Sequence, residues 1–250
     1  MKKITAIIPT LNEETHIDEA IKSVSFADEI IVIDSYSTDK TLEIAEKHNV
    51  KIIKREFDDF SSQKNFAIQQ AKHTWIYILD ADERVTPAVE KEILVAVNNP
   101  KDKVGFFVRR SFYFAGRNIN YGGCQRDKVV RLFLKEHCCY KGVVHETIST
   151  DGKLGFFKNK IEHYSYKSYD HYISKMNHYG ALRGKQYFDE GKKVNIFFHI
   201  LIKPQARFVI HYFIRLGFLD GFPGFIFAKA QAYGVYVRYV KLWLLNKGVK

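Results

Sequence analysis

Residues 2–83 alternate between short apolar runs and segments with helical periodicity, and this alternation restricts the fold of the 250-residue chain more than any other feature. The apolar runs are typical of buried strands and cover residues 2–9, 27–35, 50–57 and 74–83. The segments between them repeat apolar residues at helical spacing and cover residues 12–25, 37–49 and 61–72. Strands and helices in alternation predict a parallel sheet covered by helices on both faces.

The pattern loosens after residue 85. We expect further helices and strands there, with helices at 86–99 and 169–193 and strands at 103–116, 127–136 and 142–152. The predicted fold class is α/β, with a mixed, mainly parallel sheet flanked by helices and a C-terminal amphipathic helical region. The predicted domains are residues 1–194, with halves at 1–95 and 96–194, and residues 195–250.

Charge is distributed unevenly along the chain. Residues 1–100 carry 12 Lys and Arg against 18 Asp and Glu, a net charge of −6, whereas residues 101–194 carry +10 and residues 195–250 carry +7. A basic surface attracts nucleic acid, anionic lipid or a phosphorylated substrate. Apolar residues make up 46% of the chain, which is enough for a buried core and argues against general disorder.

The chain ends and the cysteines bear on its compartment. The start, MKKITAIIPT, has too few apolar residues before Pro9 for a secretory signal peptide. Cys124, Cys138 and Cys139 form no even framework, so we expect reduced thiols in a cytoplasmic protein. No CxxC motif is present, so a structural zinc site has little support.

Residues 195–250 are rich in aromatic and basic side chains. They hold 13 of the 37 aromatic residues and a single acid, Asp220. Their uncharged runs fall short of the ~20 residues that a spanning helix needs. We therefore expect amphipathic helices that lie in the membrane interface, on the inner face of the cytoplasmic membrane. The alternatives are a helical hairpin packed on the catalytic domain and a dimer interface.

Polar residues follow three of the predicted strands where each strand ends. Thr10 and Asn12 follow the first strand, Asp34 the second, and Asp80 and Asp82 the fourth. In open parallel sheets, ligands bind beyond the carboxyl ends of the strands. These side chains are therefore expected to face one crevice.

Asp80 and Asp82 lie two residues apart in the sequence YILDADER. Carboxylates so close repel each other unless a cation lies between them or one binds a proton. Mg²⁺ or Mn²⁺ would relieve the repulsion, because hard divalent ions prefer oxygen ligands and take their remaining ligands from substrate phosphates and water. The alternative is that both acids merely end a strand.

Four motifs resemble, in order and spacing, the nucleotide-sugar half of the family 2 glycosyltransferases, which have the GT-A fold. They are AIIPTLNEE, IIVIDSYSTDKT, SSQKNFAI and WIYILDADE, and they lie within about the first 95 residues. Three later segments resemble the branch that contains lipopolysaccharide core glucosyl- and heptosyl-type transferases. They are RLFLKEHCCYKGVVHETI, HYSYKSYDHYISKMN and GFLDGFPGFIFAKAQAYGVYVRYVKLW.

The resemblance implies a role for each matching residue on the donor side. Pro9 and Leu11 would line the nucleobase pocket, and Asp34 would bind the base or the ribose. Lys64 and Asn65 would lie beside the nucleotide.

The acid motif and the position after the second strand complete this donor site. The resemblance implies that Asp80 approaches the ribose or the metal, and that Asp82 ligates the metal that bridges the diphosphate. Ser35 departs from the family pattern, since many relatives have a second Asp there.

An inverting transfer needs a carboxylate that accepts the proton of the acceptor hydroxyl. The candidates are Glu146, which we favour, and Asp127. Glu146 is otherwise a surface acid on an edge strand, and Asp127 otherwise pairs with Arg126 or Arg131. No ED-like motif, where family 2 enzymes usually carry this acid, is present.

Two further residues are candidates for the donor site. His145 would complete the metal shell, and imidazole suits Mn²⁺ better than Mg²⁺. Arg131 would bind a phosphate, because its planar fork matches oxyanions. The alternatives are a structural hydrogen bond for His145 and a solvated strand charge for Arg131.

The predicted function is a metal-dependent, inverting transfer of a sugar from a nucleotide-diphosphate sugar to a lipid-linked saccharide, in lipopolysaccharide core biosynthesis. A nucleotidyltransferase is disfavoured because PTLNEET lacks the glycines of a phosphate loop. A basic RNA- or membrane-binding module without catalysis would leave the acid cluster unexplained. No nucleic-acid partner is expected, and the sequence is compatible with an oligomer.

Overall fold

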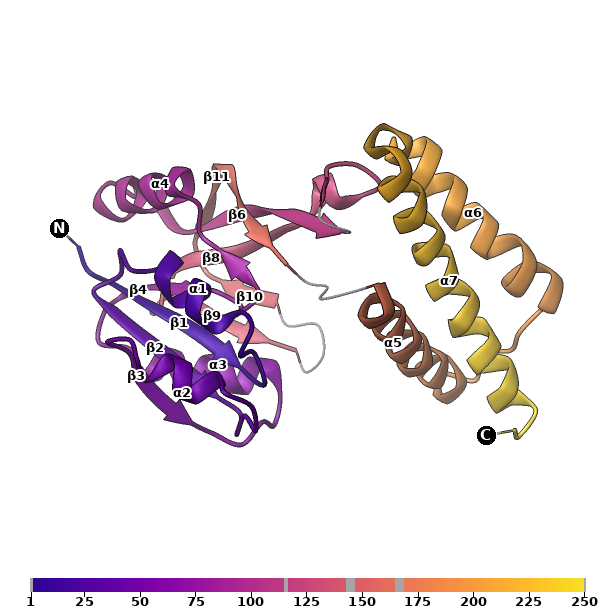
Figure 1. The fold of residues 1–250 in the computed structure, drawn as a ribbon, viewed down its shortest axis with the longest axis horizontal. Helices are drawn as coiled ribbons and strands as arrows, with labels where there is room; N and C mark the ends of the chain where they lie inside the picture. The colour runs from indigo at the N-terminus through magenta and orange to yellow at the C-terminus, as the bar shows by residue number, and fades with distance from the viewer. Residues whose placement is uncertain (1, 115–116, 143–146, 165–168, 250) are drawn as a thin grey trace. The chain divides into compact units, whose positions relative to one another are not determined.

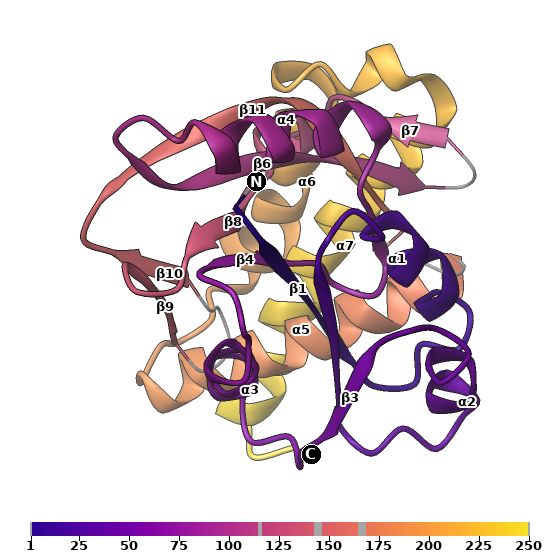
Figure 2. The same ribbon diagram turned by 90° about the vertical axis from the view of Figure 1, so that its left-hand side faces the viewer.

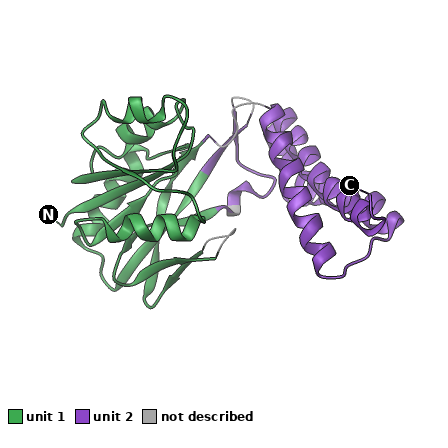
Figure 3. Ribbon diagram, turned by 90° about the horizontal axis from the view of Figure 1, so that it is seen from below, with its two compact units in different colours: residues 1–110, 128–163 green, residues 111–127, 164–250 purple. Residues whose placement is uncertain are grey.

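The computed structural model describes residues 2–114, 117–142, 147–164 and 169–249. The chain divides into two compact units. Unit 1 contains residues 1–110 and 128–163, and unit 2 contains residues 111–127 and 164–250 (Figure 3). Residues 164–194 therefore group by compactness with the C-terminal region, while the domain division at residue 194 stays a prediction.

Unit 1 is built on a mixed sheet with strand order β3-β2-β1-β4-β8-β6-β11-β5. Its parallel part is formed by β1 (Ile4–Thr10), β2 (Glu29–Asp34), β3 (Lys51–Lys54) and β4 (Trp75–Ile78). β1 pairs with both β2 and β4, with Thr10 opposite Asp34 and Ile7 opposite Ile78. The carboxyl ends of these strands consequently meet at one edge of the sheet (Figure 1).

The remaining strands of unit 1 extend the sheet in antiparallel pairs or form a small hairpin. They are β5 (Glu83–Arg84), β6 (Lys103–Phe114), β8 (Lys128–Leu134), β9 (Cys138–Lys141), β10 (Thr147–Thr150) and β11 (Lys153–His163). Residues 111–114 of β6 belong to unit 2. β8 pairs with β4 and β6, and β11 pairs with β5. β9 and β10 form a separate two-stranded sheet.

Alternating side chains of the central strands enter two different cores. In β4, Trp75 and Tyr77 pack on one face of the sheet, and Ile76 and Ile78 pack on the other. The first face is covered by α1 (Ile17–Ser23), α2 (Thr41–Ala45) and α4 (Pro87–Asn98), and the second by α3 (Phe60–Gln69). Figure 2 shows α4 beside β6 and β11, away from α3.

The predicted fold class is confirmed, because the sheet is mixed, mainly parallel where the strands alternate with helices, and buried on both faces.

The helices after β1 and β2 are shorter than their periodicity predicts. α1 begins only after His16, and the Asn12 side chain accepts a hydrogen bond from the Thr38 N–H at 2.8 Å. Asn12 thus joins two loops at the strand ends, with a φ of 57°.

Unit 2 is mainly helical. It contains β7 (Arg117–Ile119), η1 (Cys124–Arg126), α5 (Tyr169–Asp189), η2 (Phe197–Ile202), α6 (Lys203–Val209), η3 (Ile210–Ile214), η4 (Gly217–Asp220) and α7 (Gly221–Asn246). α5 and α7 pack so closely that a Cβ added at Gly184 would lie 2.9 Å from the Arg238 carbonyl oxygen. Among the described helices, none combines the length and apolarity needed to span a membrane.

Candidate active site

The acids of YILDADER lie on a tight turn at the carboxyl end of β4. The Glu83 N–H donates to the Asp80 carbonyl at 2.9 Å, so the buried apolar strand ends in a four-residue turn. Asp80 and Asp82 are the first and third residues of this turn, and Glu83 begins β5. The sequence folds this way because β4 is buried up to Leu79, where the apolar run ends.

Asp80 is paired with two cations from different elements. Its carboxylate accepts a hydrogen bond from Arg131 Nη2 of β8, and its Oδ1 lies 3.4 Å from Lys64 Nζ of α3. Burial would raise the pKa of Asp80, but the charges of Arg131 and then Lys64 outweigh it and hold this pKa well below its usual range. Asp80 is therefore an anion at any physiological pH.

Glu83 forms a second ion pair with the Arg131 guanidinium. It is fully buried, and its Oε1 lies 2.5 Å from Arg131 Nη2 and 3.4 Å from Arg110 Nη1. Burial would lower the pKa of Arg131, but Asp80 and Glu83 raise it well above its usual value. The buried Nε of Arg131 has no hydrogen-bond partner, so this side chain retains an unused donor.

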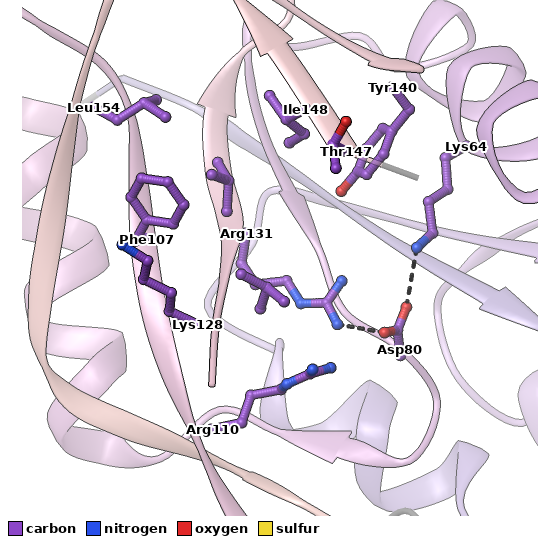
Figure 4. Close-up of a pocket in the computed structure, with 12 residues that line it drawn as sticks. Lys64, Asp80, Phe107, Arg110, Lys128, Arg131, Tyr140, Thr147, Ile148 and Leu154 are labelled. Atoms are coloured by element: carbon purple, nitrogen blue, oxygen red, sulfur yellow. Dashed lines mark hydrogen bonds and ion pairs between the residues drawn. The ribbon is translucent and has the colours of Figure 1, made fainter. Parts of the chain in front are cut away.

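A cavity of about 470 Å³ lies beside these ion pairs. Its walls carry the cations Lys64, Arg110, Lys128 and Arg131, with Asp80 as the one acid among its lining residues. In Figure 4, Arg131 and Lys64 both point toward Asp80. Ligand pockets of proteins have this size, and an excess of cations fits an anionic ligand such as a diphosphate.

Asp82 lies beside a histidine that is distant in sequence. Asp82 Oδ2 is 3.4 Å from His163 Nε2, and His163 is brought there because β11 pairs with β5, with His163 opposite Glu83. Two ligands at right angles on Mg²⁺ are roughly 3 Å apart, so the pair fits a hard divalent ion. Within the described residues, no group of three or more side chains that could hold a metal ion occurs.

The other strand ends are connected by a hydrogen-bond network. Asp34 is fully buried, and it accepts hydrogen bonds from Thr10 Oγ1 at 3.2 Å and from the Ser37 N–H at 2.9 Å. Ser35 Oγ accepts a hydrogen bond from Gln63 Nε2 at 2.5 Å. Any contact of Asp34 with a base or ribose has to compete with these bonds, and that role stays a prediction.

The remaining donor-side residues differ in their surroundings. Leu11 is 51% exposed and Pro9 is half-buried at the end of β1. Asn65 exchanges two 2.9 Å hydrogen bonds with the backbone of Tyr140, which joins α3 to β9. Lys64 Nζ also lies 5.1 Å from the ring centre of Tyr140. The nucleotide contacts predicted for these residues stay predictions.

The described residues do not test the two candidate bases or His145. Glu146 and His145 lie outside those residues. Asp127 directly follows η1 and belongs to unit 2. The assignment of the base and the metal role of His145 therefore stay predictions.

A family model described as glycosyl transferase family 2 matches residues 5–143, which is more than half of the chain. A glycosyltransferase of Rickettsia bellii is 31% identical to this chain, over 96% of it and 86% of the relative. The chain therefore belongs to glycosyl transferase family 2, and the predicted enzyme class, a glycosyltransferase, is confirmed at this level.

Two further similarities are more specific in name. The lipopolysaccharide core biosynthesis glycosyltransferase LpsC of Rhizobium meliloti is 27% identical over 94% of this chain and 93% of its own length, which confirms the resemblance to that branch. Glucosyl-3-phosphoglycerate synthase of Mycobacterium tuberculosis, solved with Mn²⁺ and UDP, is 21% identical, with a TM-score of 0.39 over 45% of this chain and 44% of its own. Structural similarity this weak transfers neither a ligand nor a role to this chain.

Three residues of the site were not identified from the sequence. Glu83 follows the acid pair and could have been suspected from the third carboxylate in the cluster. Arg110 and His163 carry no local signal, because each reaches the turn only through strand pairing in the sheet.

Proposed function

We propose that this chain transfers a sugar, with inversion, from a nucleotide-diphosphate sugar to a lipid-linked saccharide in lipopolysaccharide core assembly. The main support for binding of a nucleotide-sugar donor is the cation-lined cavity beside the acid turn. Lys64, Arg110 and Arg131 supply positive charge complementary to a diphosphate. The name of the relative LpsC supports the acceptor class.

A divalent ion fits at Asp82 and His163, as Mg²⁺ or Mn²⁺. Bound there, it would neutralise charge that builds on the departing diphosphate. Asp80 holds Arg131 and Lys64 in place, and its approach to the ribose or the metal stays a prediction. Glu146, or alternatively Asp127, accepts the proton of the acceptor hydroxyl.

The donor side is tested by Asp82→Asn and His163→Gln, with release of nucleoside diphosphate measured over a panel of nucleotide sugars with Mn²⁺. We expect a loss of about a hundredfold or more for Asp82→Asn, which is typical when one electrostatic stabiliser is removed from an active site. EDTA should abolish transfer in the wild type. The matched control is the exposed pair His137–Asp151, at 2.8 Å, whose variants His137→Gln and Asp151→Asn should transfer normally.

Normal turnover in Asp82→Asn would remove Asp82 from the site, and Mn²⁺-dependent turnover unchanged in His163→Gln would remove His163. The base is tested separately. Glu146→Gln should bind donor and lose transfer, and the same phenotype in Asp127→Asn alone would reassign the base.

The acceptor side is supported by the helical arm of unit 2, which we define as residues 197–214. Two adjacent exposed residues recur every four residues along the arm. They are apolar in every pair except Gln205 and Ala206. The exposed apolar face consists of Phe197, Phe198, Leu201, Ile202, Val209, Ile210, Phe213 and Ile214. Phe197 is 68% exposed and Ile214 is 70% exposed.

The charged residues of the arm lie on the opposite side. Every fourth residue is basic, and all of these side chains are buried or half-buried; they are His199, Lys203, Arg207, His211 and, just beyond the arm, Arg215. Lys203 Nζ, for example, donates to Tyr239 Oη of α7 at 2.8 Å. A water-exposed helix normally has the reverse arrangement, so the exposed apolar face needs an apolar environment.

We assign that environment to an anionic lipid surface at the inner face of the cytoplasmic membrane. Residues 191–219 contain five Lys or Arg and no acid. Of these, Lys192 and Lys193, just before the arm, are exposed, and anionic lipid supplies the charge opposite to theirs. Co-sedimentation with phosphatidylglycerol vesicles should fall at least tenfold in Phe197→Ser/Phe213→Ser and persist in Val95→Ser, a 68% exposed residue of α4. Loss of a dimer instead of loss of vesicle binding would refute this assignment.

A further inference from the structure

Unit 2 contains a group of basic residues that we call the arginine cluster: Arg207, Arg215, Arg238 and His211. Arg207 and Arg215 contact the His211 ring, and the charge of Arg238 acts on Arg207. Arg207 Nη1 and Arg215 Nη1 each lie 3.4 Å from His211 Nε2. His211 is only 5% exposed. Burial and then the charges of Arg215 and Arg207 lower the pKa of His211 to about 4, so the ring is neutral and accepts from the guanidinium groups.

A cavity of about 190 Å³ opens beside this cluster. Two of its wall residues are Arg207 and Arg238, and the others are uncharged, among them Met176, Tyr179 and Gln231. The Nε of Arg238 is buried and has no hydrogen-bond partner. A water molecule takes up about 30 Å³, so the cavity has room for a phosphate group together with water.

The acids of the described residues do not pair with the arginine cluster. On the part of the chain that the structure describes, none of its three arginines has an acid within ion-pair distance. Asp220, the one acid of residues 195–250, accepts instead from the N–H groups of Asn120 and Tyr121, at 3.1 and 2.8 Å. Burial, followed by the charges of Arg238 and Arg215, lowers the pKa of Arg207.

Half-buried like charges that lie close together repel each other, and chains tolerate such conflicts mainly at functional sites. An anion in the cavity would relieve the repulsion. Guanidinium groups bind phosphate oxygens in pairs of parallel hydrogen bonds, and a phosphate monoester brings up to two negative charges to three positive ones.

We propose that the arginine cluster binds a phosphate group, through Arg207 and Arg238, in the cavity between α5, α6 and α7. His211 positions Arg207 and Arg215 by accepting from both. The phosphate belongs to a lipid headgroup or to a phosphorylated molecule in solution. Its use as an acceptor subsite rests on the proposed glycosyltransferase function, whereas the binding itself does not.

The test is hydrogen–deuterium exchange of the full chain, read on peptides from residues 203–215 and 231–240. One arm adds inorganic phosphate or pyrophosphate, against chloride at equal ionic strength. The other adds phosphatidylcholine vesicles with phosphatidic acid, against phosphatidylcholine alone. Peptides from unit 1, such as residues 60–69 and 128–134, report separately on any anion at the donor cavity.

We expect slower exchange in the unit 2 peptides of the wild type and of Arg183→Gln, which removes an exposed cation of α5. Arg238→Gln should weaken the apparent affinity about tenfold or more, the scale of a charge-assisted hydrogen bond. Protection by soluble phosphate supports a free phosphate group as ligand, and protection only by phosphatidic acid supports a headgroup.

A second readout separates a binding site from a structural cluster. Without ligand, Arg238→Gln should melt at the same temperature as the wild type or higher, because it removes like-charge repulsion. Two outcomes would overturn the proposal. One is exchange that neither phosphate nor phosphatidic acid slows beyond its control, and the other is full protection from exchange in Arg238→Gln. Loss of sugar transfer in Asp82→Asn with intact phosphate protection would separate the donor site from this one.

Discussion

Replacing Arg131 by Met removes the cation that joins the acid turn to β8. Arg131 is 3% exposed and contacts both Asp80 and the fully buried Glu83. In the variant, Glu83 keeps the more distant cation Arg110, with Nη1 at 3.4 Å, and the Asp80 N–H at 3.3 Å. Removing one partner of a buried ion pair costs about 3–5 kcal/mol, because a buried charge is left uncompensated. For a chain of this size, the melting temperature should fall by roughly 6–20 °C.

The assay is urea unfolding followed by fluorescence of Trp75, which is buried in β4 of unit 1. The matched control is Lys153→Met, which breaks an exposed ion pair with Asp102 and should cost less than about 1 kcal/mol. The double variant Arg131→Met/Glu83→Leu should recover about 1–3 kcal/mol relative to the sum of the single variants, because the orphaned carboxylate is gone.

The acid dependence gives a second check on the same ion pairs. The pKa of Asp80 is lower in the folded than in the unfolded state. Its contribution to stability is therefore complete above pH ~4, the unfolded pKa, and is lost as the pH falls toward the folded value. This acid loss should be smaller in Arg131→Met. A stability of Arg131→Met within about 1 kcal/mol of the wild type would refute the reasoning.

Two further predictions concern unit 2. The pKa of His211 is about 4 in the folded protein and 6.5 in the unfolded chain. Between these two pH values the imidazole binds a proton only in the unfolded chain. The free energy of unfolding should therefore fall by about 3 kcal/mol as the pH drops from 6.5 to 4. Urea titrations of His211→Gln should lack this loss, whereas the exposed His178→Gln should retain it. Gly184→Ala should cost about 1–3 kcal/mol in calorimetry, because its Cβ would meet the Arg238 carbonyl at 2.9 Å. Gly234→Ala, which meets only the flexible Met176 at 3.3 Å, should be neutral or stabilising, and equal costs for both would contradict the packing.

The helix boundaries show how tertiary contacts overrode local signals. Asn12 has the side chain of a helix cap, yet it binds Thr38 across the strand ends. Ser37 similarly bonds with Asp34 instead of capping α2. The loops after β1 and β2 bind each other because the two strands end side by side. The sequence of one loop contains no information about the other loop that it will meet.

The helical arm was predicted as amphipathic from its composition, but the composition did not reveal which face is buried. Its contacts with α7 place the basic row inward, where Lys203 meets Tyr239 and His211 lies near Phe227. The exposed apolar face is the consequence, and it follows from packing rather than from hydropathy.

The sequence by itself determined the alternation of strands and helices in residues 2–83 and the position of Asp80 and Asp82 at a strand end. Both are local properties, since side-chain periodicity and the end of an apolar run are set by neighbours along the chain. Only the tertiary structure decided which groups meet those acids. Arg131 and His163 reach the turn through strand pairings that join residues 48 and 81 positions apart, and such long-range pairings are fixed by the register of the whole sheet.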